Sequence, residues 1–352
     1  MKDLRVGKKL SFTVISLSVL VFVISYYYSL PDRSEKTLHV IGQHPPDEVV
    51  TLFLHVKPVD SGISIEAKLK SQVKFFEVET FPAEKLKAFL DLSCETSNHK
   101  YEEVEPLFQQ FGKKFFDPIE TFIRQCTEIE FVLADESLIQ YPFDLLFYQG
   151  RPLFIQKPVA YSFDQVGPKK IDLKGISRVL LISDASADPE RAVSKVQQYL
   201  KNNTYKDIND VKPGDFKTAG PVELLLVSAH GHIFDNEDDY MEFGDEHLKA
   251  EYLADLKPKL VYFDSCFMGA SCDFIRLFRN NGVEFYIAPW VPNEAGNSST
   301  KTMCLFFEAL DLYGDPAYAM YLTKRQLYEH FSKKKIDFML FFRSSPFRVY
   351  RL

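Results

Sequence analysis

Residues 224–232 read LLLVSAHGH, and residues 260–269 read LVYFDSCFMG. In each stretch a short apolar run, typical of a strand buried in a parallel sheet, leads directly into a segment with a reactive side chain. If the two strands are neighbours, His230 and Cys266 emerge at the same edge, roughly 5–10 Å apart, because adjacent strands are about 4.8 Å apart. The sequence therefore predicts a histidine–cysteine pair at the carboxyl edge of a sheet, where such sheets bind ligands.

Strands and helices alternate around these two stretches. Short apolar runs predict further strands at 129–134, 179–183 and 285–288, and helical patterns lie at 189–200, 270–280 and 300–313. Nearer the N-terminus, strands with a hairpin are predicted within 49–56 and 63–78, a helix at 82–92, and a long amphipathic helix at 103–126 that bends near Pro118. This order predicts an α/β fold with a mainly parallel sheet flanked by helices.

The N-terminal segment reads as a membrane anchor. Residues 10–30 are apolar, carry no charge, and are long enough to span a bilayer, which takes roughly 20 residues. Basic residues lie in the flank 1–9, tyrosines end the apolar run, and no small-x-small cleavage site of a signal peptide precedes Pro31. We therefore expect a single-pass, uncleaved transmembrane helix at 10–30, a linker at 31–48 and a globular domain at 49–345.

The charge pattern bears on topology and on partners. The basic flank, set against balanced charges after the span, favours a cytoplasmic N-terminus and a catalytic domain on the non-cytoplasmic side. The chain has 352 residues, 46% of them hydrophobic, and a scattered net charge of −7. This composition predicts a real core and no nucleic-acid surface. Five cysteines without CxxC spacing leave at least one thiol outside any intramolecular disulfide.

Cysteine and histidine together suit nucleophilic catalysis. A thiolate is the attacking species, and a nearby imidazole lowers the pKa of the thiol and later protonates the leaving amine. Gly231 lets the backbone approach a substrate closely, so its N–H and that of Cys266 are candidates for an oxyanion hole. Each residue alone is more often structural, as a core cysteine or a turn histidine, but their joint placement favours a dyad. No cofactor is expected.

The motifs SAHGHIFD at 228–235 and VYFDSCFMG at 261–269 resemble the histidine and cysteine motifs of the CHAT domain family, within the caspase-like (clan CD) cysteine peptidases. The flanks LADESLIQYPFDLLFYQGRPLFIQKPVAYSFD at 133–164 and APWVPNEAGNSSTKTMCLFFEAL at 288–310 are similar to segments of that family. The resemblance implies a caspase-like fold and hydrolysis of a protein or peptide substrate through Cys266 and His230. Many relatives carry partner-sensing repeats that this chain lacks, so any activating partner is unidentified.

The residues before the nucleophile differ from many CHAT domains. They read Asp264-Ser265-Cys266, which is similar to metacaspases. That resemblance implies that Asp264 lines the primary specificity pocket and selects arginine or lysine before the scissile bond. Asp264 could instead brace the turn that holds Cys266, because aspartate readily bonds local backbone groups.

Two other functions are consistent with the sequence. His230, His232 and Asp235 could hold a metal, although a complete set of ligands is not evident. A membrane-tethered, non-catalytic scaffold with a caspase-like fold is the second alternative, because a fold does not imply a function. The presence of His230, Gly231 and Cys266 favours the peptidase.

Overall fold

The computed structural model describes residues 46, 48–60, 62–79, 101–200, 203–207, 216, 220–233, 238–243, 246–333 and 339–352. All of them belong to one compact unit that spans 39–352. The predicted anchor at 10–30, most of the linker and the predicted helix at 82–92 lie outside these residues. In the described part of the chain, no helix combines the length and the apolar character that crossing a bilayer requires.

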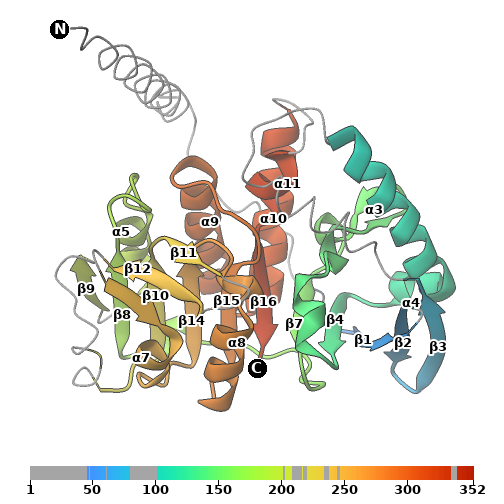
Figure 1. Cartoon of the computed structure of the whole chain (residues 1–352), viewed down its shortest axis with the longest axis horizontal. Coiled ribbons are helices and arrows are strands. Elements are labelled where there is room, and N and C mark those ends of the chain that lie inside the picture. Colours follow the sequence, from blue (N-terminus) through green and yellow to red (C-terminus); the bar gives the residue numbers. More distant parts are fainter. Residues whose placement is uncertain are drawn as a thin grey trace, which may run out of the picture. The chain divides into compact units, whose positions relative to one another are not determined.

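Within the described residues, eleven strands form one sheet, in the order β3-β2-β1-β4-β7-β16-β15-β14-β10-β8-β9 (Figure 1). Most neighbours are parallel; β1–β2, β2–β3 and β15–β16 are antiparallel. The predicted α/β class with a mainly parallel, helix-flanked sheet is confirmed. The strands are β1 (Thr51–Val59), β2 (Gly62–Leu69), β3 (Gln72–Val78), β4 (Glu128–Leu133), β7 (Val159–Ser162), β8 (Val179–Ser183), β9 (Asn203–Asp207), β10 (Leu224–Ser228), β14 (Leu260–Asp264), β15 (Phe285–Pro289) and β16 (Phe347–Arg351).

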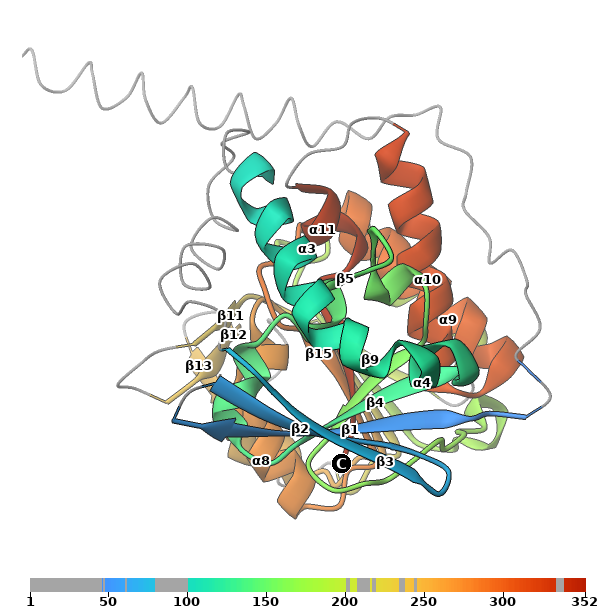
Figure 2. The same ribbon diagram turned by 90° about the vertical axis from the view of Figure 1, so that its right-hand side faces the viewer.

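The N-terminal part of the sheet is an antiparallel extension on β4. The segment 63–78 is two strands, because the chain turns at Lys70, whose φ is 53°. The amphipathic helix predicted at 103–126 is α3 (Tyr101–Phe116) followed by α4 (Glu120–Gln125), and Pro118 lies in the 3₁₀ turn between them. Both helices lie along one face of β1–β4 (Figure 2).

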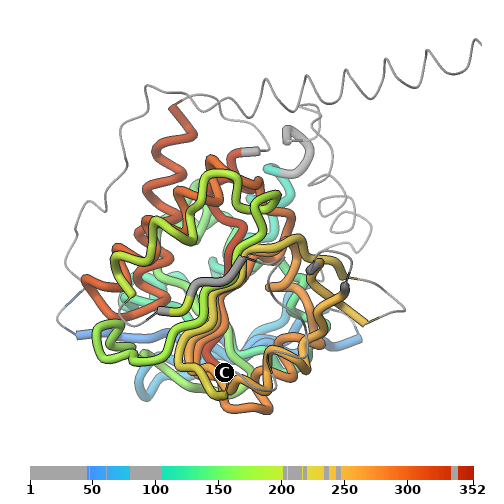
Figure 3. The backbone as a smooth tube through the Cα atoms, turned by 90° about the vertical axis from the view of Figure 1, so that its left-hand side faces the viewer, coloured from blue at the N-terminus to red at the C-terminus, as the bar shows by residue number. Residues whose placement is uncertain are grey.

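Helices cover both faces of the C-terminal part of the sheet, as the view from the β9 edge shows (Figure 3). Alternate residues of β10 enter different cores: Leu225 and Val227 pack with α7 (Ala250–Ala254) and α8 (Cys272–Asn280), whereas Leu224 and Leu226 pack with the helices of the opposite face. Those helices are α5 (Ala192–Val196), α9 (Asn297–Tyr313) and α10 (Pro316–Ser332). A strand buried on both faces needs a continuous apolar run, which is what its sequence supplies.

The last strand, β16, lies in the middle of the sheet. It follows α11 (Met339–Ser344). It pairs in parallel with β7 on one side and antiparallel with β15 on the other (Figure 1). The sheet therefore includes residues beyond the 49–345 expected for the globule. Its two arginines, Arg348 and Arg351, are buried and are paired with carboxylates from the N-terminal half of the chain.

Candidate active site

The predicted neighbours β10 and β14 are adjacent parallel strands, and Ser228 is directly opposite Asp264 in the register. The two strands therefore end at the same level. The segment 229–232 and the segment 265–269 leave the sheet side by side, as expected for a histidine–cysteine site at this edge. The strand β8 ends level with them, because Ser183 is opposite Ser228.

Gly231 lies against the peptide backbone of Cys266. A Cβ atom placed on Gly231 would be 2.4 Å from the Cys266 carbonyl oxygen and 3.2 Å from the Cys266 nitrogen. The main chains that carry the two predicted oxyanion-hole donors are thus in contact. In a small antiparallel sheet, Gly231 is opposite Met241, and the neighbouring pair is joined by a hydrogen bond from Glu242 N to His230 O. Hydrogen-bonded and non-hydrogen-bonded pairs alternate along an antiparallel ladder, so Gly231 and Met241 form a non-hydrogen-bonded pair. The Gly231 N–H therefore takes no part in the strand pairing.

Replacing Gly231 by alanine should therefore damage the site. The new methyl group would force the histidine segment away from Cys266, and a displacement of about 1 Å can cost roughly 100-fold in rate. We expect kcat/KM to fall by about that factor. Gly220→Ala is the control, because its φ of +68° strains alanine while nothing lies within 4 Å. Equal turnover in Gly231→Ala and the wild type would contradict this packing argument.

The predicted nucleophile, Cys266, lies on a sharp turn. Phe267, which follows Cys266 directly, has a left-handed backbone with φ of 64°, and a 3₁₀ turn at Met268–Ala270 comes next. This conformation is costly for an aromatic residue, by about 1–3 kcal/mol, and such strain concentrates at functional sites. Cys266 is partly exposed and is not in a disulfide with any other described cysteine.

The Cys266 sulfur contacts the backbone of Asn293, in the loop after β15. The Asn293 N–H donates to Sγ at 3.3 Å, and Sγ lies 3.6 Å from the Asn293 carbonyl oxygen. The first contact would stabilise a thiolate and the second a neutral thiol, because an N–H donates to the sulfur and a carbonyl oxygen accepts from it. The contact between Asn293 and Cys266 was not predicted, because it depends on the path of a loop.

His230 is half-buried, and its Nε2 is 3.0 Å from the Oγ of Ser186. Ser186 belongs to the loop after β8, the third strand that ends at this edge. Its partnership with His230 was not predicted. The only available signal was the position of Ser186 just beyond a predicted strand.

Asp264 is buried, with 5% of its surface exposed, and three neutral side chains bond its carboxylate. Ser228 donates to Oδ2 at 3.0 Å, Asn293 donates to Oδ1 at 2.5 Å, and Ser299 contacts both oxygens at 2.7 and 2.8 Å. No lysine or arginine of the described residues lies within ion-pair distance. Burial, which outweighs these hydrogen bonds, raises the pKa of the Asp264 carboxyl to about 6.

Asn293 links the two groups, since its side chain bonds Asp264 and its main chain bonds the Cys266 sulfur. Asp264 and Cys266 are therefore connected through one intervening residue, Asn293. This arrangement is compatible with a bracing role and with a role in the substrate pocket.

The titration of Asp264 predicts a pH-dependent stability. The folded chain binds this proton more tightly than the unfolded chain, whose pKa is near 3.8. The free energy of unfolding should therefore fall by an amount on the order of 3 kcal/mol as pH rises from about 4 to about 6. Above that pH the contribution of Asp264 should stay level. The free energy of unfolding in urea should be measured for the wild type and for Asp264→Asn across pH 4–7. The wild-type value minus the Asp264→Asn value should show this decline.

Asp135→Asn provides a control of opposite sign. Bonds from Ser137 lower the pKa of the exposed Asp135 carboxyl, so the corresponding difference should not fall as pH rises. A flat difference curve for Asp264→Asn would show that the folded and unfolded chains bind the Asp264 proton equally.

The side chains of the metal-binding alternative are arranged differently from what a metal site requires. His232 Nε2 lies 2.9 Å from the Glu242 carboxylate, across β11 (Gly231–His232) and β12 (Tyr240–Phe243), and Asp235 lies outside the described residues. In the part of the chain that the structure describes, no three His, Cys, Asp or Glu side chains are grouped as metal ligands.

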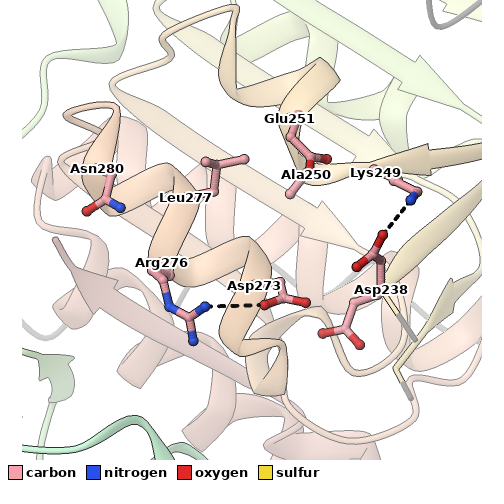
Figure 4. A pocket seen from close by; sticks show the side chains of 9 residues that line it. Asp238, Lys249, Ala250, Glu251, Asp273, Arg276, Leu277 and Asn280 are labelled. Carbon is pink, nitrogen blue, oxygen red and sulfur yellow. Dashed lines mark hydrogen bonds and ion pairs between the residues drawn. The ribbon is translucent and has the colours of Figure 1, made fainter. Parts of the chain in front are cut away.

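A cavity of about 210 Å³ lies near the site, between α8 and the strands β12 and β13 (Glu246–Lys249) (Figure 4). It does not include Cys266 or His230. Its charged side chains pair with one another, Lys249 with Asp238 and Arg276 with Asp273. Asp239, in its wall, accepts a hydrogen bond from Ser271, which caps α8. Arg276 also bonds Glu136, which lies outside the lining, so the cavity wall has more carboxylates than cations.

No protein-family model matches the chain, and no curated protein matches its sequence. The resemblance to the CHAT domain family therefore stays a prediction that rests on the quoted motifs.

Proposed function

We propose that the chain is a membrane-anchored cysteine endopeptidase with a caspase-like fold, in which Cys266 is the nucleophile and His230 the general base. The observation that carries the proposal is the contact between Gly231 and the Cys266 backbone at the ends of two paired parallel strands. This contact sets the main chain that carries the imidazole and the Gly231 N–H beside the main chain that carries the thiol and the Cys266 N–H. The motif resemblance and the helix-flanked parallel sheet support the same assignment.

The proposed reaction proceeds in two stages. His230 accepts the thiol proton, and the Cys266 thiolate attacks the peptide carbonyl, whose oxygen receives N–H donors from Gly231 and Cys266. The C–N bond breaks as His230 gives its proton to the leaving amine. Water, deprotonated by His230, then hydrolyses the thioester and releases the acid and the thiol. The contact of Sγ with the Asn293 backbone must yield when a substrate carbonyl arrives.

Labelling distinguishes this proposal from the non-catalytic scaffold. The purified chain in detergent is treated with peptidyl electrophiles, and the modified residue is identified by mass spectrometry. A peptidase should be modified at Cys266, and His230→Ala should greatly slow that reaction. Absence of labelling at Cys266 by every peptidyl probe, with ordinary reactivity toward a small alkylating reagent, would favour the scaffold.

The proposed specificity is for arginine or lysine before the scissile bond, with Asp264 in the primary pocket. Its support is a buried carboxylate that has only neutral partners among the described residues. A substrate guanidinium would provide the missing cation through a charge-assisted, bidentate bond. The bracing role remains the competing explanation, because the carboxylate already accepts three donors.

We therefore expect reporters with Arg or Lys before the cut to be cleaved at least about tenfold faster than reporters with Leu or Asp, since a charged hydrogen bond contributes about 1.5–3 kcal/mol. In Asp264→Asn this preference should weaken selectively. Ser228→Ala is the matched comparison, because it removes one donor to Asp264 and keeps the carboxylate. Equal cleavage of basic and apolar reporters by the wild type would leave Asp264 with a structural role.

The membrane anchor and its topology also belong to the proposal. Residues 10–30 would hold the catalytic domain on the non-cytoplasmic face, with the basic flank inside. Protease added to sealed, right-side-out cells should then digest the domain, and protection of the domain would reverse the assignment.

A further inference from the structure

Ser186 is in direct contact with the imidazole of His230. Its Oγ lies 3.0 Å from Nε2, which is within hydrogen-bond distance. Ser186 is exposed and His230 half-buried, so the pair lies at the surface that a substrate would approach. One ring nitrogen of the predicted base is thus already engaged by a side chain.

The turn that carries Ser186 is fixed at both ends. Asp184 Oδ1 accepts the Ser186 N–H at 2.8 Å, and the Asp184 carbonyl accepts the N–H groups of Ala187 and Asp188. Asp184 N donates to Ser228 O at 2.8 Å, which ties the turn to β10. Asp188 accepts hydrogen bonds from the first N–H groups of α5 and from Ser183. The Ser186 hydroxyl is therefore held by a turn that is anchored to β8 and to β10, the strand that leads into His230.

We propose that Ser186 is a positioning residue for His230, an inference that rests on the proposed peptidase function. The Ser186 oxygen accepts the Nε2–H, so the neutral ring keeps its lone pair on Nδ1. The thiol proton of Cys266 then moves to Nδ1, the S–H bond breaks, and Ser186 continues to accept from the resulting imidazolium. Because the ring orientation and the tautomer are set by the partner of the second nitrogen, Ser186 favours the thiolate–imidazolium pair.

A serine beside a histidine is also the arrangement of a serine nucleophile and its base. The contact between Gly231 and the backbone of Cys266 favours the cysteine, because the main chain with the candidate oxyanion donors belongs to the residue that bears the thiol and to its close neighbour. The test therefore includes this alternative as an outcome.

The experiment measures the rate of iodoacetamide alkylation at Cys266 between pH 5 and 9, using the full chain in detergent and mass spectrometry of the peptide that contains Cys266. It needs no knowledge of the substrate. Burial raises the pKa values of the Cys126, Cys272 and Cys304 thiols to about 11, so these should react slowly near neutral pH. The alkylation rate reports the fraction of thiolate at Cys266.

We expect Ser186→Ala to lower the rate at pH 6.5 about tenfold and to move the rise of the curve to higher pH. Ser186→Thr, which keeps the hydroxyl, should retain most of the wild-type rate. Ser137→Ala is the matched control, because Ser137 is an exposed serine in the loop after β4 and bonds Asp135. Its curve should coincide with that of the wild type.

The outcomes separate this inference from the proposed function. Dependence of alkylation on His230 without any effect of Ser186→Ala would overturn the positioning role and leave the peptidase intact. Independence from both His230 and Ser186 would remove the dyad and both proposals with it. Modification of Ser186 by a fluorophosphonate, with hydrolysis retained in Cys266→Ala, would make Ser186 the nucleophile and overturn the positioning role.

Discussion

Replacing Cys266 by alanine is expected to abolish peptide hydrolysis, and His230→Ala is expected to do nearly the same. In the proposed mechanism the two side chains act as one unit, in which the imidazole generates the thiolate and then protonates the leaving amine. Removing either member of such a unit costs almost the whole effect, roughly a thousandfold or more in kcat. The variants should remain folded, because both side chains lie partly exposed at the edge of the sheet.

Turnover and circular dichroism should be measured on the same preparations. Cys272→Ala is the matched control, because Cys272 is also partly buried, begins α8, and lies only a few residues beyond the nucleophile. It should keep the wild-type rate. Wild-type turnover in a folded Cys266→Ala protein would end the cysteine mechanism.

Of the substitutions proposed here, Arg351→Met should lower the free energy of unfolding the most. Arg351 is fully buried, and its guanidinium bonds Glu128 at 2.5 and 3.0 Å and Glu130 at 3.0 Å. Without it, Glu128 and Glu130 lose their bonded cation in the interior, and buried Asp315, 3.6 Å from the guanidinium, loses its ion pair as well. Burial already raises the pKa of Glu128, and breaking such a buried pair costs about 3–5 kcal/mol.

Urea unfolding monitored by fluorescence and circular dichroism measures this loss. Arg279→Met is the control, because Arg279 pairs with Asp164 at 2.7 Å on the exposed surface, where a pair contributes about 1 kcal/mol or less. Similar destabilisation by the two substitutions would mean that the buried pair contributes no more than a surface one. Triple replacement with Glu128→Gln and Glu130→Gln should recover part of the loss, since it removes the stranded charges.

The central strands were predictable because their sequences satisfy both faces of a parallel sheet. The runs at 179–183, 224–228 and 260–264 match β8, β10 and β14 residue for residue. The helix predicted at 189–200 was too long: α5 covers only 192–196, because Arg191 adopts a left-handed conformation and a 3₁₀ turn follows at 197–199.

The strand β16 was missed for a physical reason. Its sequence, FRVYR, places arginine at two of five positions, which is typical of an exposed strand or of a loop. The carboxylates of Asp144, Glu128 and Glu130, and that of Asp315 at 3.6 Å from Arg351, make those positions suitable for burial. No local pattern encodes partners that are about 200 residues away along the chain.

The candidate site likewise has a part that was predictable from local sequence and a part that was not. His230 and Cys266 follow directly from strand ends, so their placement depends only on the order of strands in the sheet. Ser186 and Asn293 reach the site through loops, whose paths depend on tertiary contacts such as those of Asp184 and Glu294. Asp264 was found from its place on β14, but its three neutral partners come from three separate segments.

The central place of β16 also affects how the protein would respond to a break in its chain. Among the described strands, the connection at 163–178, between β7 and β8, is the one covalent crossing from the half of the sheet that ends at β7 to the half that begins at β16. A cut there would leave two fragments, yet β16 of the later fragment would stay paired with β7 of the earlier one, and Arg351 would stay bonded to Glu128 and Glu130. Such a nicked protein would persist as a noncovalent complex of two chains with its cysteine and histidine together on one of them.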